Sequence, residues 1–279
     1  MSKSLITEKV CQSYRKILIK NTYKYNQQDL KRSAIVFSPH FDDETLACGG
    51  TIFKKKREGA NVKIVFMTDG SKSHRNLISE DELRVIRKNE CLACCRSLGL
   101  VENDVFCLDF EETKLKNFFD SAIERVKEII SEQQPDEIFI PHFREPLLWS
   151  SDHLTTTKIV KSALWSYTRD LIIYEYPVWL WLHWPWVELF ARQNPLRNII
   201  FKNTLIYIFG LRVLREFNCS LLIEDVMENK QNALAQYKSQ MTRLLPDSKW
   251  ATLNDVSNGE FLKCFFQKHE IFRRYYSSK

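Results

Sequence analysis

The sequence lacks several features that mark membrane, secreted or dinucleotide-binding proteins. It has only seven glycines in 279 residues, and no Gly-x-Gly-x-x-Gly loop follows its first β-rich run, which argues against a dinucleotide-binding module. No stretch reaches the ~20 uninterrupted apolar residues of a membrane-spanning helix. The N-terminal segment has a polar, helical pattern and not the continuous apolar core of a signal peptide. We therefore expect a cytoplasmic protein without a spanning segment.

Cysteine spacing and charge exclude two further classes. The eight cysteines are unevenly spaced, and no second Cys-x-x-Cys accompanies Cys91, Cys94 and Cys95, so reduced core thiols are favoured over disulfides or a zinc cluster. The 41 Lys and Arg against 35 Asp and Glu give 41 − 35 = +6. This excess is scattered and not concentrated with aromatics on one element, so we expect no nucleic-acid partner. The sequence does not indicate an oligomeric state.

The first two thirds of the chain alternate between strand and helix patterns. Short apolar runs predict strands at 33–38, 62–68, 105–108, 137–141 and 171–176. Helical patterns occupy 44–58, 80–98, 115–133 and 152–167. This alternation is typical of an α/β fold, with a mostly parallel, Rossmann-like sheet and helices on both faces.

After Pro177 the composition changes. A tryptophan-rich stretch is followed by an apolar and basic segment, then by predicted helices at 225–245 and 260–276. No repeat or flexible linker separates these parts. We predict a single domain over 1–279, with a core at about 33–176 and a helical, aromatic elaboration at about 177–279.

Two clusters of polar residues follow predicted strands. The first is the run Pro39 to Glu44 (PHFDDE), and the second leads from Pro141-His142 to Asp152-His153. Ligands gather at the carboxyl ends of strands in parallel sheets. Acidic residues there often only cap a helix, but one His and three carboxylates within five residues, without a cation among them, are costly unless a metal neutralises them. We therefore predict a hydrolytic zinc site.

These residues also carry a family resemblance. PHFDDE resembles the PHPDDE signature of the GlcNAc-phosphatidylinositol de-N-acetylases, the PIG-L or LmbE-like family. The resemblance continues through Gly49-Gly50, the VFMTDG run, the segment from Arg87 and Asp152-His153, and ends with YEYPVWLW from Tyr174 and KQNALAQYKSQ from Lys230. It spans residues 33–276, most of the chain.

The resemblance implies a Rossmann-like fold, one zinc ion and removal of the acetyl group from an N-acetylglucosamine-type conjugate. It implies His40, Asp43 and His153 as ligands and Asp42 as general base. We expect Asp152, beside His153, to take part in catalysis. Arg87 is expected either to reach the substrate or to pair with Glu90.

The sequence departs from the family pattern at two positions. Phe41 replaces a proline, and Ser150 stands where the family has a histidine. We hypothesise that His142 partly replaces that histidine; the alternative is that it only begins a loop. A second hypothesis is that Trp184 or Trp186 borders the substrate cleft, although tryptophans are more often core residues. Because of Ser150, the alternative to an enzyme is a metal-retaining sugar- or partner-binding protein of the same fold.

Overall fold

The computed structural model describes residues 3–74, 76–148, 150–189, 194–245 and 249–277. Its centre is an eight-stranded sheet in the order β1-β7-β8-β6-β5-β2-β3-β4. The strands are β1 (Tyr23–Lys24), β2 (Ala34–Ser38), β3 (Val62–Thr68), β4 (Val105–Phe110), β5 (Glu137–Pro141), β6 (Ile172–Tyr176), β7 (Cys219–Leu222) and β8 (His269–Tyr276). All pairings are parallel except those of β8 with β6 and β7.

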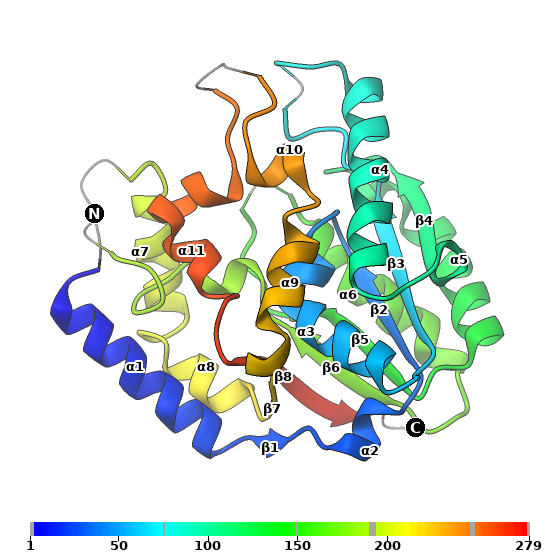
Figure 1. Ribbon diagram of the computed structural model, residues 1–279, viewed down its shortest axis with the longest axis horizontal. Helices are drawn as coiled ribbons and strands as arrows, with labels where there is room; N and C mark the ends of the chain where they lie inside the picture. The colour runs from blue at the N-terminus through cyan, green and yellow to red at the C-terminus, as the bar shows by residue number, and fades with distance from the viewer. Residues whose placement is uncertain (1–2, 75, 149, 190–193, 246–248, 278–279) are drawn as a thin grey trace.

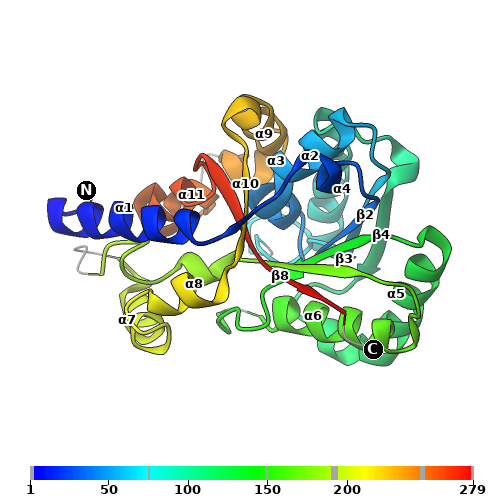
Figure 2. The same cartoon turned by 90° about the horizontal axis from the view of Figure 1, so that it is seen from below.

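Helices cover both faces of this sheet (Figures 1 and 2). They are α1 (Leu5–Lys20), α2 (Gln27–Leu30), α3 (Asp43–Arg57), α4 (Glu80–Ser97), α5 (Phe119–Gln133), α6 (Asp152–Ala163), α7 (Arg197–Ile206), α8 (Leu211–Glu216), α9 (Met227–Leu234), α10 (Lys238–Met241) and α11 (Glu260–Lys263). Alternate strand residues separate two cores, because successive side chains point to opposite faces. Val36 joins the core under α3, α4 and α9, whereas Ile35 and Phe37 join the core under α5 and α6.

The expected α/β fold is confirmed. All five predicted strands form, and the predicted helices at 44–58, 80–98 and 152–167 form within a few residues of their expected bounds. The pattern at 115–133 begins with a 3-10 turn, Leu115–Phe118, before α5. The division into a core and an elaboration stays a prediction, although the sheet itself includes strands from residues outside 33–176.

The predictions for the C-terminal part were partly wrong. The predicted helix 225–245 is broken into α9 and α10 at Tyr237, whose ψ of 64° is not helical and whose hydroxyl reaches Glu44. The predicted helix 260–276 is short α11 followed by strand β8. Pairing on both sides with β6 and β7 outweighs the local helical pattern there, because strand preference depends strongly on tertiary context.

Among the described residues, no helix has the length and apolar character needed to cross a membrane.

Candidate metal centre

The loop between β2 and α3 positions the first half of the site. The hydroxyl groups of Ser38 and Thr68 donate to the carbonyl oxygens of His40 and Pro39, which fixes the loop against β3. Asp42, the residue before α3, has a φ of 113°, in the left-handed region that non-glycine residues avoid. Such backbone strain is concentrated at functional sites. The Asp43 carboxylate turns back and accepts a hydrogen bond of 3.1 Å from the His40 backbone nitrogen.

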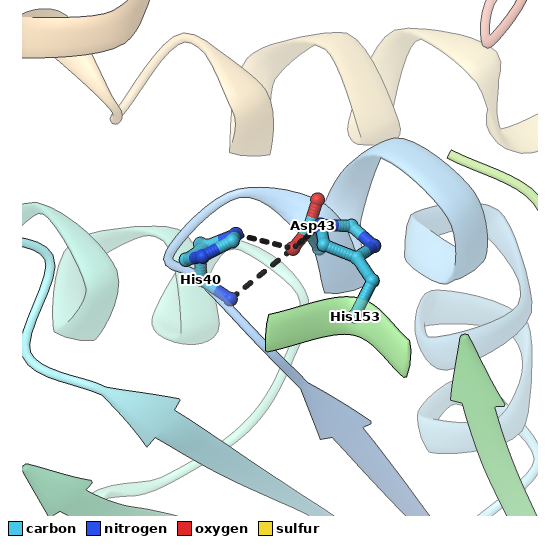
Figure 3. A group of neighbouring side chains, drawn as sticks. All are labelled: His40, Asp43 and His153. Atoms are coloured by element: carbon cyan, nitrogen blue, oxygen red, sulfur yellow. Dashed lines mark hydrogen bonds and ion pairs between the residues drawn. The ribbon is translucent and has the colours of Figure 1, made fainter. Parts of the chain in front are cut away.

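The start of α6 supplies the second half. β2 and β5 are hydrogen-bonded neighbours in the sheet, so the segment after β5 returns to the edge that carries His40. There His153 Nε2 lies 3.3 Å from Asp43 Oδ2, and the His40 and His153 ring centroids are 5.2 Å apart. Figure 3 shows both rings directed toward the Asp43 carboxylate. One potential ligand atom from each of these three residues lies within 4.8 Å of the others.

These three side chains fit a zinc ion. Two imidazoles and one carboxylate are zinc's usual donors, and three protein ligands leave a position open for chemistry. Both nitrogens of His153 are buried and without a hydrogen bond in the described part of the chain. Burial lowers the pKa of His153 to about 4, which keeps the imidazole neutral, the form that binds metal. A cation between the rings would satisfy atoms that are otherwise costly to bury.

Two carboxylates support the histidines from behind. Asp152 Oδ2 lies 3.2 Å from His40 Nε2 and accepts a 2.7 Å hydrogen bond from the Thr113 backbone nitrogen. Glu145 Oε2 lies 3.9 Å from His153 Nδ1. Burial opposes protonation of His40, but its hydrogen bonds to Asp152 and Asp43 outweigh that effect and hold its pKa well above the usual range. Carboxylates of this kind orient metal-binding histidines and raise their basicity.

Asp42 lies beside the cluster, in a different environment from Asp43. Its Oδ2 accepts a 2.9 Å hydrogen bond from Gln240 Nε2. Burial, followed by the charge of Asp43, raises the pKa of Asp42 well above its usual range. For Asp43, burial also acts to raise the pKa, but the attraction of His153 and His40 outweighs it and lowers the pKa. Adjacent carboxylates with opposite shifts are suited to different roles, one as ligand and one as proton acceptor.

Glu44 holds the loop in place and does not face the cluster. Its carboxylate accepts hydrogen bonds from the Tyr237 and Thr45 hydroxyls and from the Asp42 backbone nitrogen. Phe41, at the family's proline position, is buried against Phe66 at 4.9 Å between ring centroids.

Arg87 is a buried cation near these carboxylates. Its side chain is 1% exposed, and Nη1 lies 3.9 Å from Glu112 Oε1. Nε and Nη2 have no hydrogen-bond partner among the residues that the structure describes. Glu90, the alternative partner predicted for Arg87, instead accepts two hydrogen bonds from Ser239. Guanidinium donors left open in this way can bind an acceptor that the described residues do not supply.

The structure places His142 against α8, and its role in place of the family's histidine stays a prediction. Its Nδ1 accepts from the Arg144 backbone nitrogen at 3.2 Å, and Nε2 lies 3.3 Å from Glu216 Oε2. The ring packs 5.0 Å from that of Phe217. His142 continues the face of β5 that carries Ile138 and Ile140, because strand side chains alternate with period two. That alternation directs it toward α8 and not toward the metal ligands.

The structure places Trp184 and Trp186 in contact with α1, and a position of either at the substrate cleft stays a prediction. Trp186 is fully buried between Tyr14 and Trp181, and Trp184 donates to Thr7 in α1. The stretch is not extended, since it contains the 3-10 turn Trp179–Trp181, so alternation does not apply. Instead Trp179 lies 6.4 Å from the His153 ring.

Sequence reasoning missed three residues beside the centre. Gln240 and Trp179 lie in KQNALAQYKSQ and YEYPVWLW, two segments that carry the family resemblance, and that was the available signal. Glu145 had no signal, because it is a lone carboxylate in a connecting segment. Its contacts with the backbone nitrogens of Val178 and Trp179 depend on the folded chain.

Comparison with known proteins shows which proteins this chain is similar to. Residues 35–164 match the family PIG-L, described as GlcNAc-PI de-N-acetylase. A diacetylchitobiose deacetylase of Thermococcus kodakarensis is 27% identical over 145 residues, covering 51% of this chain and 53% of the relative. The chain thus matches about half the length of that curated relative.

Two solved structures have a similar fold. The N,N'-diacetylchitobiose deacetylase from Pyrococcus horikoshii matches with a TM-score of 0.63 and 21% identity, covering 98% of this chain and 94% of that one. The 4-carboxy-2-hydroxymuconate hydratase from Pseudomonas putida matches with a TM-score of 0.57 and 13% identity, covering 89% and 97%. The fold therefore occurs with two different reactions, and the reaction must be argued from side chains. Residues 35–164, which carry His40, Asp43 and His153, are the part of the chain that is similar to the PIG-L family.

Proposed function

We propose that this protein is a zinc-dependent deacetylase that hydrolyses the acetamide of an N-acetylated amino sugar. The observation that carries the proposal is the His40–Asp43–His153 cluster with a separate buried carboxylate, Asp42, next to it. The PIG-L match and the deacetylase relative support this reaction. The N-acetylglucosamine-type substrate is proposed on the same basis.

The residues of the centre have different roles in the proposed hydrolysis. His40, Asp43 and His153 would hold a zinc ion, which would supply Lewis acidity for the attack of water on the amide carbonyl. Asp42, held by Gln240, accepts a proton from that water as its oxygen bonds to the carbonyl carbon. The C–N bond then breaks, the amine takes up a proton, and acetate and a free amino sugar leave. The high pKa of Asp42 suits a group that must take a proton and return it.

The surrounding side chains would bind and orient the sugar. Arg87 offers unpaired guanidinium donors for hydroxyl groups. Trp179, stacked at 4.8 Å on Phe261, offers an aromatic surface beside His153 that could pack against a sugar ring. These two residues take the substrate-binding role that sequence reasoning divided between Arg87, Trp184 and Trp186.

We also propose that the protein is located in the cytoplasm. All eight cysteines are free, and all except Cys107 are buried, which fits a reducing, cytoplasmic location.

The direct test is acetate release from a panel of N-acetylated sugars, with metal content measured on the same sample. We expect one zinc per chain and activity that a chelator abolishes and added zinc restores. Protein with full zinc and no acetate release from any member of the panel would contradict the proposed reaction.

The second candidate, a metal-retaining binding protein, rests on Ser150. Its hydroxyl accepts a 3.3 Å hydrogen bond from the Asp152 backbone nitrogen, but it is not an acid near neutral pH. The Ser150→His variant separates the candidates. An inactive parent protein whose Ser150→His variant releases acetate would favour the binding protein. His142→Ala serves as control, and we expect no change in acetate release, because His142 faces α8.

A further inference from the structure

The helices α7 and α8 and the turn between them carry large apolar side chains on their outer surface. These side chains are 43% to 51% exposed and belong to Phe201, Leu205, Ile206, Ile208, Phe209 and Leu211. We call these six residues the α7–α8 surface. A helix at a protein surface normally directs its apolar stripe inward. Single exposed apolar residues need no explanation, whereas a contiguous group marks a binding surface.

The inward face of α7 carries two hydrogen-bonded polar residues beside the buried Ile200. Asn203 Nδ2 donates to the Leu182 carbonyl oxygen at 3.1 Å, and Thr204 Oγ1 accepts from the Trp184 backbone nitrogen at 3.0 Å. Just beyond the helix, the Tyr207 hydroxyl donates to the Arg144 carbonyl oxygen at 2.6 Å. Rotating the helix to bury Phe201 and its neighbours would break all three bonds. The outward direction of the apolar residues is therefore fixed by the fold.

The charges around this surface have one sign. Residues 194–215 contain four cations and no Asp or Glu; the cations are Arg197, Lys202, Arg212 and Arg215. The next carboxylate, Glu216, is already paired with Arg144. The neighbouring helix α1, which reaches Gly210 through Tyr14, adds the exposed residues Ile17, Lys16 and Lys20.

Exposed apolar residues between cations suit the interface of an anionic lipid bilayer. Apolar side chains enter the boundary between headgroups and acyl chains, while Lys and Arg meet the negative headgroups. A second copy of this chain is a poorer partner, because a symmetric contact would bring the same cations together. Figure 2 shows α7 and α8 at one end of the molecule, on the side away from α3 and α9.

We propose that the α7–α8 surface docks on lipid bilayers that contain anionic lipids, as a peripheral contact. This proposal does not depend on the deacetylase reaction. The surface is nevertheless connected to the metal centre, since Tyr207 contacts Arg144 and the next residue, Glu145, lies beside His153.

The test is co-sedimentation of the full chain with phosphatidylcholine vesicles, with or without about one third phosphatidylserine. We expect pelleting with the anionic vesicles, little with phosphatidylcholine alone, and release at high salt. The double variant Phe201→Glu/Leu205→Glu should stay in the supernatant. Val101→Glu, at an exposed apolar residue outside this surface, should pellet like the parent. Circular dichroism checks that each variant is folded.

A charge variant tests whether the cations of the α7–α8 surface contribute to binding. Lys202→Ala should weaken binding to anionic vesicles roughly fivefold, since each cation near such a surface contributes a similar factor. Lys127→Ala on α5 is the matched control and should bind like the parent. The proposal is overturned if the parent does not pellet with anionic vesicles. It is also overturned if Phe201→Glu/Leu205→Glu pellets with anionic vesicles as the parent does. The same holds if the parent is a dimer that does not bind vesicles and the double variant is a monomer.

Discussion

The two walls of the metal centre differ in how completely their polar atoms are paired. In the first wall, residues 38–45, every fully buried side-chain nitrogen and oxygen has a hydrogen-bond partner. In the second wall, the described residues of 142–157, buried atoms of His142, Asp152, His153 and Thr156 have none. Unpaired buried polar atoms are rare in proteins and need a reason.

This difference indicates that the two walls have different roles. The first wall is a rigid frame that positions His40, Asp42 and Asp43 before any ligand arrives. The second wall leaves partners to be supplied from outside, by the metal and by the substrate. Catalytic sites depend on such a preorganised frame, because groups that must be ordered during the reaction raise its barrier.

The largest effect should follow from removing a histidine from either wall. His40→Ala and His153→Ala each delete a proposed ligand. Loss of an outer-shell partner typically lowers metal affinity about 10–100-fold, and we expect the zinc affinity of both variants to fall by more than that. Elemental analysis after dialysis measures this directly. Full zinc occupancy in His153→Ala would show that the second wall does not need a metal.

The next effect separates the two carboxylates of the first wall. Asp42→Asn should retain zinc and lose acetate release by about 10²–10⁴-fold, the usual contribution of a positioned proton acceptor. Asp43→Asn is the matched variant one residue away, and it should lose zinc instead. If Asp42→Asn released acetate at the parent rate, Asp42 could not be the base.

A smaller effect tests the contact between the walls. Asp152→Asn keeps an oxygen for the Thr113 backbone nitrogen but removes the charge beside His40. We expect zinc affinity to fall about 10–100-fold without loss of fold. Ser151→Ala, at the neighbouring position, should have the affinity of the parent. Equal affinities of Asp152→Asn and the parent would mean that His40 is oriented by Asp43 alone.

The smallest effect concerns substrate binding. Trp179→Leu should raise KM about 2–10-fold, the range expected from one aromatic contact, with zinc content unchanged. Trp184→Leu is the control, since Trp184 contacts α1 and not the histidines. A larger KM change in Trp184→Leu than in Trp179→Leu would reverse this assignment.

The sequence alone was sufficient to predict that the proposed ligands lie close together. His40, Asp43 and His153 follow two buried strands, and parallel neighbours end at one edge of a sheet, so the cluster required only that β2 and β5 pair. The roles of these residues stay predictions. His142 follows β5 as well, but its direction depended on which face of the strand it continued, and proximity in sequence did not show this.

The C-terminal errors have a tertiary cause. His269 to Tyr276 has a helical aromatic pattern, yet this segment pairs with one edge of β6 and one edge of β7. Tyr237 interrupts a helical pattern because its hydroxyl contacts Glu44, nearly 200 residues earlier. No window of local sequence contains either interaction.

The position of β8 has a consequence for the nascent chain. β8 is the last strand to be synthesised, yet it lies between β6 and β7. The strands from β2 to β6, and with them the proposed ligands His40, Asp43 and His153, have been synthesised once residue 176 has left the ribosome. The remaining 276 − 176 = 100 residues take about 5–20 s at roughly 5–20 residues per second. Throughout that interval β6 presents an unpaired edge, which makes it the segment on which a chaperone would be expected to act.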